Sequence, residues 1–229
     1  MPSYQKIYEH HADRYDELIR HEDHAGNLAA LLDRTLIPRP RVAVELGCGT
    51  GRVTRLLAAR AEIVRAYDRE LHMIDFARAG SAAKNLTYGV ADNATLPERD
   101  GEADLVIAGW TIGHLTGFYP DSWRGHATRV LTEMHRVCAA HHGKLVIIET
   151  LGTCVDAPGP PNERLAEFYE FLEREHSFRR EVISTDYAFA SIEDASRVMG
   201  FFFGPGMADS VKARGSNIVP EWTGVWGTP

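Results

Sequence analysis

A short apolar stretch that leads into a glycine-rich turn constrains the fold of this chain most strongly. Apolar residues 42–44 are followed by the acid Glu45, and three glycines then alternate over 47–51 before a segment, 54–60, of helical character. Glycine costs conformational entropy, so this spacing indicates either left-handed backbone angles or a ligand that lies against the main chain. The N-terminus of the following helix presents unpaired N–H groups and a positive dipole end, which suit the anionic end of a ligand.

Predicted strands alternate with predicted helices through the first two thirds of the chain. Strands are expected at 42–44, 62–67, 85–91, 104–108 and 145–150, and helices at 54–60, 71–79 and 121–138. This alternation implies right-handed βαβ units and a parallel sheet whose ligand crevice lies at the carboxyl ends of the strands.

The two ends of the chain are predicted to add further elements around this unit. Apolar and aromatic residues recur at spacings of three and four over 4–19, which predicts an amphipathic helix. This helix either packs on the domain or folds over the ligand site as a lid. The other expected elements are helices at 26–36, 162–175 and 191–203, strands at 178–188 and about 208–213, and a tail with two tryptophans docked on the core.

Composition and charge narrow the class of partner. The chain has 229 residues, 44% of them hydrophobic, a formal charge of −7 and a pI of about 5.9. No basic stripe offsets phosphate repulsion, so small molecules are expected as partners rather than nucleic acid or a membrane. Three widely spaced cysteines and the lack of an apolar signal-peptide core predict a cytoplasmic protein. We expect a monomer or a homodimer.

The spacing of the glycines separates two kinds of nucleotide-like ligand. Dinucleotide-binding loops need G-x-G-x-x-G, whereas Arg52 follows Gly51 here and the pattern is G-x-G-x-G. A nicotinamide or flavin cofactor is therefore disfavoured, and the Gly-Lys-Ser/Thr ending of a kinase-type phosphate loop is absent. Asp68 follows the second strand about twenty residues after the first glycine, a separation at which a carboxylate can reach ribose hydroxyls.

Several of these motifs, in this order, resemble the class I S-adenosylmethionine-dependent methyltransferases. The matching segments are Glu45-Leu-Gly-Cys-Gly-Thr-Gly51, Asp68, Ala91-Asp92, Asp104-Leu-Val-Ile-Ala and Gly143-Lys144. The opening Tyr8-x-x-x-Ala12-x-x-Tyr15-Asp16 is similar to the N-terminal lid of small-molecule members. The carboxyl third resembles the tails of poorly characterised bacterial and archaeal members.

The resemblance implies a Rossmann-like three-layer α/β/α sandwich. Its sheet would have seven mostly parallel strands, with an antiparallel strand near the C-terminus and a helical lid at the N-terminus. Residues 1–229 would form a single methyltransferase domain. Within it, 1–38 would be the lid, 39–151 the cofactor-binding core, and 152–229 the part that completes the sheet and the substrate wall.

The resemblance also implies a site for S-adenosylmethionine, with S-adenosylhomocysteine as product. Asp68 would bind both ribose hydroxyls, Glu45 the amino group of the methionyl part, and Asp92 the adenine amino group, with Met73 and Asn93 beside the adenine. The whole implied set is Tyr15, Glu45, Gly47, Cys48, Gly49, Gly51, Arg52, Asp68, Met73, Asp92, Asn93, Gly109 and Trp110.

The chemistry of methyl transfer asks little of the protein beyond alignment. The sulfonium is already activated, and positioning alone can supply about 7–11 kcal/mol of barrier reduction, so one base at most is needed. His114, after the fourth strand, is the candidate catalytic residue, and the alternative is a histidine that holds its own loop. Tyr8 and His114 would line the substrate pocket. No metal site is expected, because the pair His21 and His24 lacks acids in any arrangement that methyltransferases are known to use for a metal.

Two functions remain open at this level. One is methyl transfer to a small-molecule acceptor by in-line displacement. The other is a non-catalytic module that binds S-adenosylmethionine as a sensor and keeps the same cofactor residues.

Overall fold

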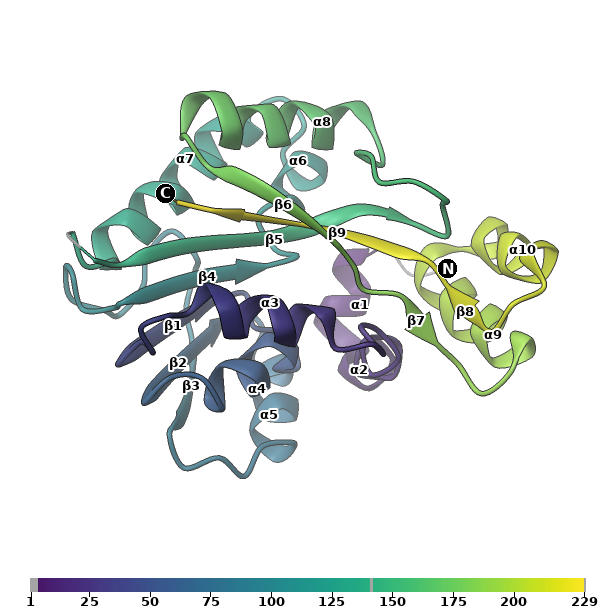
Figure 1. Ribbon diagram of the computed structural model, residues 1–229, viewed down its shortest axis with the longest axis horizontal. Coiled ribbons are helices and arrows are strands. Elements are labelled where there is room, and N and C mark those ends of the chain that lie inside the picture. The colour runs from purple at the N-terminus through teal and green to yellow at the C-terminus, as the bar shows by residue number, and fades with distance from the viewer. Residues whose placement is uncertain (1–3, 141, 229) are drawn as a thin grey trace.

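A seven-stranded sheet crosses the structure, a computed structural model that describes residues 4–140 and 142–228 (Figure 1). In spatial order its strands are β3 (Leu86–Val90), β2 (Ile63–Asp68), β1 (Val42–Leu46), β4 (Leu105–Gly109), β5 (Lys144–Thr153), β9 (Glu221–Gly227) and β6 (Arg179–Ser184). Strand β9 is antiparallel to both of its neighbours, and the pairs from β3 to β5 are parallel. This confirms the predicted mostly parallel sheet with an antiparallel strand near the C-terminus.

Helices cover both faces of the sheet, which confirms the three-layer sandwich (Figure 1). One face carries α3 (Asn27–Thr35), α4 (Arg52–Ala58) and α5 (Leu71–Ala79), and the other carries α6 (Leu115–Phe118), α7 (Trp123–Val137) and α8 (Glu163–Glu170), which continues into the π-helical turn Phe171–Glu175. Strand β1 is buried throughout because Ala43 faces the α3 and α4 layer while Val42 and Val44 face α7.

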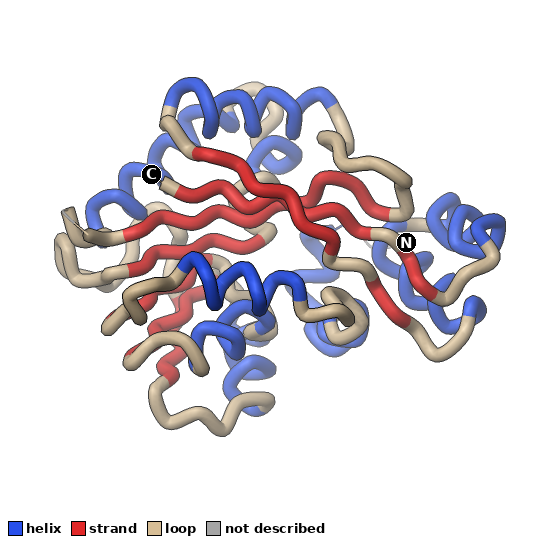
Figure 2. The backbone as a smooth tube through the Cα atoms, viewed as in Figure 1, coloured by secondary structure: helices blue, strands red, loops and turns tan. Residues whose placement is uncertain are grey.

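The two ends of the chain meet beside this sandwich. The N-terminal helices α1 (Tyr4–His10) and α2 (Ala12–Ile19) pack with α9 (Ile192–Phe203), α10 (Pro205–Arg214) and the small antiparallel sheet of β7 (Tyr187–Ala188) and β8 (Ile218–Val219). Figure 2 shows this second sheet apart from the main one. The helices and the small sheet share an apolar cluster of their own, which includes Ile7, Leu18, Val198 and Phe202. Within the described ranges, none of the helices combines the length and apolar character needed to cross a membrane.

Three predictions about the ends were wrong. The strand expected at 208–213 is the second half of α10, because Pro205 begins a helix at its first turn rather than ending the previous one. The strand expected at 178–188 is two strands in two different sheets. The tail is no mere docked segment, since it forms β9 between β5 and β6 and buries Trp226 completely.

The single helix expected over 4–19 is two helices. The chain breaks at His11, whose φ of −131° lies outside the helical region. The break lets α1 and α2 present Tyr8 and Tyr15 to the same place, where the two rings meet edge to face.

Candidate functional site

The turn after β1 is built on left-handed glycines. The φ angles of Gly47, Gly49 and Gly51 are 64°, 53° and 88°, a region that costs other residues free energy. A Cβ atom at Gly47 would lie 2.3 Å from Thr111 Oγ1, and one at Gly49 would lie 3.3 Å from the Tyr15 ring. The left-handed angles expected from the sequence are therefore present, and the side chains of Thr111 and Tyr15 lie close against the turn.

Asp68 ties the end of β2 to this turn. Its Oδ2 atom accepts a hydrogen bond from the Gly49 N–H at 2.9 Å, and its Oδ1 atom accepts one from the Glu70 N–H at 2.9 Å. Burial raises the pKa of the carboxyl, and the two N–H donors oppose that rise. The carboxyl is thus held in one orientation at the carboxyl end of the sheet.

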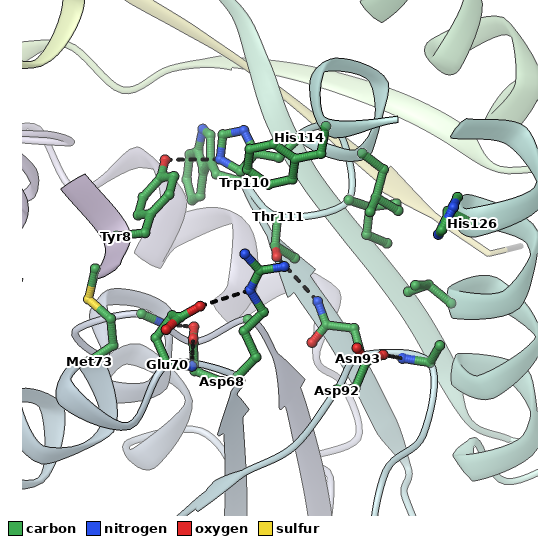
Figure 3. Close-up of a pocket in the computed structure, with 18 of the residues that line it drawn as sticks. Tyr8, Asp68, Glu70, Met73, Asp92, Asn93, Trp110, Thr111, His114 and His126 are labelled. Atoms are coloured by element: carbon green, nitrogen blue, oxygen red, sulfur yellow. Dashed lines mark hydrogen bonds and ion pairs between the residues drawn. The ribbon is translucent and has the colours of Figure 1, made fainter. Parts of the chain in front are cut away.

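A cavity of about 520 Å³ opens above the turn (Figure 3). Eight of the residues expected at the cofactor line it: Tyr15, Gly47, Gly49, Asp68, Met73, Asp92, Asn93 and Trp110. Tyr8 and His114, expected at the substrate, line it as well. Sequence elements separated by more than a hundred residues thus meet at the carboxyl ends of β1, β2 and β4, as the parallel sheet requires.

Five residues of the expected cofactor set do not line this cavity. Glu45 and Cys48 are buried, Gly51 caps α4, and Gly109 ends β4, where its Cβ would lie 3.3 Å from Val53. The fifth, Arg52, lines a second cavity instead.

Glu45 has a buried carboxyl group with one oxygen atom that is not hydrogen-bonded. Its side-chain atom Oε2 has no hydrogen-bond partner, although the residue is only 2% exposed. Burial raises its pKa to about 8, against the opposing effects of Thr54 and Arg52. A group of positive charge brought near this carboxyl would therefore be stabilised.

The second cavity, of about 610 Å³, shares a wall with the first. The shared residues are Tyr8, Tyr15, Trp110, His114 and Phe118. Behind this wall, the Arg52 guanidinium lies 3.5 Å from the centre of the Trp110 ring and forms an ion pair with Glu22. Trp110 itself has a left-handed φ of 49°, a conformation that non-glycine residues adopt rarely and that concentrates at functional sites.

His114 and Tyr8 join across the shared wall, as Figure 3 shows. The Tyr8 hydroxyl lies 3.0 Å from His114 Nε2. Burial, with a further contribution from the charge of Arg69, lowers the pKa of His114 to about 4. The imidazole is therefore neutral near pH 7 and a weak proton acceptor.

Three buried carboxyls in the second cavity were not expected from the sequence: Glu22, Glu149 and Glu221. Burial raises the pKa of Glu149 and of Glu221 to about 8. A signal for Glu149 exists, since it interrupts the apolar run at 145–151 and charged residues are seldom buried without a partner. The part of the chain that the structure describes brings together no cluster of three or more His, Cys, Asp or Glu side chains suited to a metal ion.

Comparison with known proteins shows a likeness to methyltransferases, in sequence over part of the chain and in fold over most of it. Residues 44–147 match the methyltransferase domain family. Over 106 residues the chain is 40% identical to the trans-aconitate 2-methyltransferase of Methylobacterium radiotolerans, a match that covers 42% of this chain and 39% of the relative. The chain thus spans about two fifths of the length of that curated relative.

Solved structures share the fold across most of the chain. A candidate type II methyltransferase from Anaeromyxobacter dehalogenans aligns with a TM-score of 0.64 and 17% identity, over 88% of this chain and 94% of that one. Phosphoethanolamine N-methyltransferase 2 from Haemonchus contortus, in complex with S-adenosyl-L-methionine, aligns with a TM-score of 0.59 and 15% identity, over 100% of this chain and 60% of that one. At these identities the likeness concerns the fold.

Proposed function

We propose that this chain, a class I methyltransferase by its fold and by the methyltransferase domain at residues 44–147, transfers a methyl group from S-adenosylmethionine to a small-molecule acceptor. The observation that carries the proposal is the pairing of two adjoining cavities. One is lined by the glycine turn and Asp68, and the other lies behind a thin aromatic wall. Their volumes suit a small molecule each.

The first cavity fits the adenosyl and methionyl parts of the donor. Asp68 already has its two oxygens oriented by backbone N–H groups, and their remaining lone pairs suit the ribose hydroxyls. Asp92 and Asn93 line the far part of the cavity, where the adenine would lie, with Met73 beside it. The unpartnered Oε2 atom of Glu45 suits the amino group of the methionyl part. Bound there, the donor supplies an activated methyl group.

The protein's own part in the reaction is alignment and exclusion of water. Tyr8, Tyr15 and Trp110 border both cavities, so they would lie between donor and acceptor and offer ring faces to the positive charge of the donor. Helices α1 and α2 would act as the lid, while α3 packs on the sheet with α4. His114 would hold Tyr8 in this wall and is the candidate acceptor of a proton on the acceptor side.

The extent of the domain and the location of the protein in the cell are proposed as well. We propose that residues 1–229 act as one domain with the lid, the core at 39–151 and the carboxyl part at 152–229. Cytoplasmic location is proposed from the three cysteines, all of them free in the structure.

Titration calorimetry with S-adenosylmethionine and S-adenosylhomocysteine tests the proposal. We expect both to bind, and Asp68→Ala to weaken binding about 10- to 100-fold, because a hydrogen-bonding charged group is lost. His114→Ala should leave donor binding nearly intact and lower turnover. Failure of the wild-type chain to bind either compound would refute the proposal. Tight binding without turnover of any acceptor would favour the non-catalytic module instead.

A further inference from the structure

The second cavity is lined by more acidic side chains than basic ones. Glu22, Glu149 and Glu221 bring three carboxyls, and Arg52 is the one cation among the described lining residues. Arg52 is already engaged, because it pairs with Glu22 and lies over Trp110. The cavity therefore offers no unengaged cation to a negatively charged acceptor.

The carboxyl group of Glu149 is hydrogen-bonded by backbone N–H groups of the turn after β4. Its Oε1 atom accepts a hydrogen bond from the Gly113 N–H at 2.7 Å, and the backbone of Thr111 and Ile112 also stabilises the carboxylate. This carboxyl holds the turn between β4 and α6 in place. It does not need a ligand.

Glu221 differs from Glu149 because half of its carboxyl is unsatisfied. The residue is 1% exposed, and Thr150 Oγ1 donates to its Oε1 atom at 2.7 Å. Its Oε2 atom is buried without a hydrogen-bond partner. Glu22 faces it with like charge, and the hydroxyls of Thr150 and Thr153 and the charge of Arg52 only partly compensate. A buried acceptor atom without a donor is costly, so this position calls for a hydrogen-bond donor.

We propose, on the basis of the function proposed above, that the acceptor is a small-molecule amine whose nitrogen lies against the Glu221 carboxyl in the second cavity. An ammonium supplies both the missing hydrogen-bond donor and the missing positive charge. The faces of Tyr8, Tyr15 and Trp110 in the shared wall favour a cation as well. The same site disfavours a carboxylate such as trans-aconitate, because Arg52, the one cation among the described lining residues, is already paired with Glu22.

The reaction with an amine balances without another reagent. The positive charge of a nearby ammonium favours the ionised form of Glu221. This carboxylate takes one proton from the ammonium, which frees the nitrogen lone pair. The lone pair forms the N–CH₃ bond as the S–CH₃ bond breaks, and the bonding electrons stay on sulfur as a neutral thioether. The methylated amine leaves as an ammonium, and the proton on Glu221 passes to water. A carboxyl that is half-satisfied and titrates near neutral pH suits this exchange.

Matched pairs of ligands of opposite charge test the proposal. Phenethylamine, tyramine and histamine are compared with 3-phenylpropanoate, 3-(4-hydroxyphenyl)propanoate and trans-aconitate, in binding and methyl-transfer assays with wild-type protein. Binding is measured by ligand-observed NMR in the presence of S-adenosylhomocysteine, and transfer by mass spectrometry with S-adenosylmethionine. We expect the amines to bind and to be methylated on nitrogen, and the carboxylates to do neither.

Variants assign the preference to Glu221. Glu221→Gln should raise the dissociation constants of the amines about 10- to 100-fold, and Glu221→Asp, which keeps the charge, should raise them less. Glu149→Gln is the matched control, since it removes another buried acid of the same cavity and should retain the preference for amines. Retained melting transitions and S-adenosylhomocysteine binding show that each variant is folded.

Four results would overturn the inference. These are binding of the carboxylates above the amines, transfer to oxygen alone, failure of every amine to bind, and amine binding that Glu221→Gln and Glu221→Asp leave unchanged. If S-adenosylhomocysteine still binds the wild-type chain, such a result removes the amine acceptor and leaves the proposed donor site standing. Loss of donor binding by the wild-type chain would remove the proposed function itself.

Discussion

The Tyr8 hydroxyl of α1 lies 3.0 Å from Nε2 of His114, which follows β4 more than a hundred residues later. The two rings also face each other, with centroids 5.3 Å apart. Because the His114 imidazole is neutral near pH 7, Nε2 can accept the proton of the hydroxyl. This contact links the N-terminal helix to the sheet at the wall between the two cavities.

Replacement of Tyr8 by phenylalanine should loosen α1. One hydrogen bond contributes about 0.5–1.5 kcal/mol net, so amide exchange in peptides covering α1 should quicken about 3- to 10-fold. Hydrogen–deuterium exchange read by mass spectrometry measures this without any substrate. Tyr15→Phe is the control, since it removes a hydroxyl from the same shared wall but not the contact with His114. Equal exchange in α1 for both variants and the wild type would contradict the role given to this bond.

The glycine turn allows steric crowding to be separated from backbone strain. Gly47→Ala should lower the free energy of unfolding for two reasons, since its φ is 64° and its Cβ would meet Thr111 at 2.3 Å. Gly101→Ala is the matched control, with a φ of 67° and no atom within 4 Å of the added Cβ. Gly101→Ala should lower the free energy of unfolding by about 1–2 kcal/mol, because of the left-handed angle alone. Gly47→Ala should lower it by about 1–3 kcal/mol more, because of the added crowding.

Denaturant unfolding of the two variants at one pH gives the comparison. Gly47→Ala should also lose binding of S-adenosylhomocysteine, whereas Gly101→Ala should keep it. Equal destabilisation of the two variants would show that Thr111 moves aside freely and that crowding at the turn contributes nothing.

The buried acid Glu149 makes stability depend on pH. Its pKa is about 8 in the folded chain against 4.5 for an exposed glutamate, so the folded state holds the proton more tightly. The resulting stabilisation is fully present below pH 4.5 and is lost as pH rises to 8. Glu149→Gln removes this dependence, and its free energy of unfolding should therefore fall less than that of the wild type between pH 5 and pH 9.

Urea unfolding across that pH range provides the measurement. Glu193→Gln, a change at an exposed position, is the control and should follow the wild-type profile. Parallel profiles for Glu149→Gln and the wild type would mean that the carboxyl is charged in the folded chain at neutral pH.

The lining of the first cavity was predictable because its residues follow strands directly. Asp68 is the last residue of β2, so once the strand was recognised, the parallel sheet placed its carboxyl beside the glycine turn. The same holds for Asp92 and Trp110, which follow β3 and β4. Local periodicity and sheet direction together fix these positions.

The lining of the second cavity was not predictable because its parts meet only through non-local pairing. Glu221 faces the second cavity since β9 inserts between β5 and β6, and this register sets Glu221 opposite Thr153. The sequence predicts a tail there and a strand at 208–213, because a proline between two glycines directly after residue 203 is typical of a helix end. The sequence near Pro205 does not tell whether the proline ends one helix or begins the next. Nor does any local pattern tell that a strand is inserted out of sequence order.

Alkylation of the three cysteines should follow their burial. Cys48 lies in the glycine turn, where burial and the nearby charges of Glu45 and Asp68 raise the pKa of its thiol, and burial raises the pKa of Cys138 to about 11. Cys154 is partly exposed. Because the thiolate is the reactive form, iodoacetamide at pH 8 should label Cys154 first in the native chain and all three in urea.

Cys154→Ser should leave native labelling near zero. S-adenosylhomocysteine should slow any residual labelling of Cys48 without affecting that of Cys154 in the wild type. Labelling of Cys48 as fast as that of Cys154 would show instead that the glycine turn opens readily to solvent before the donor binds.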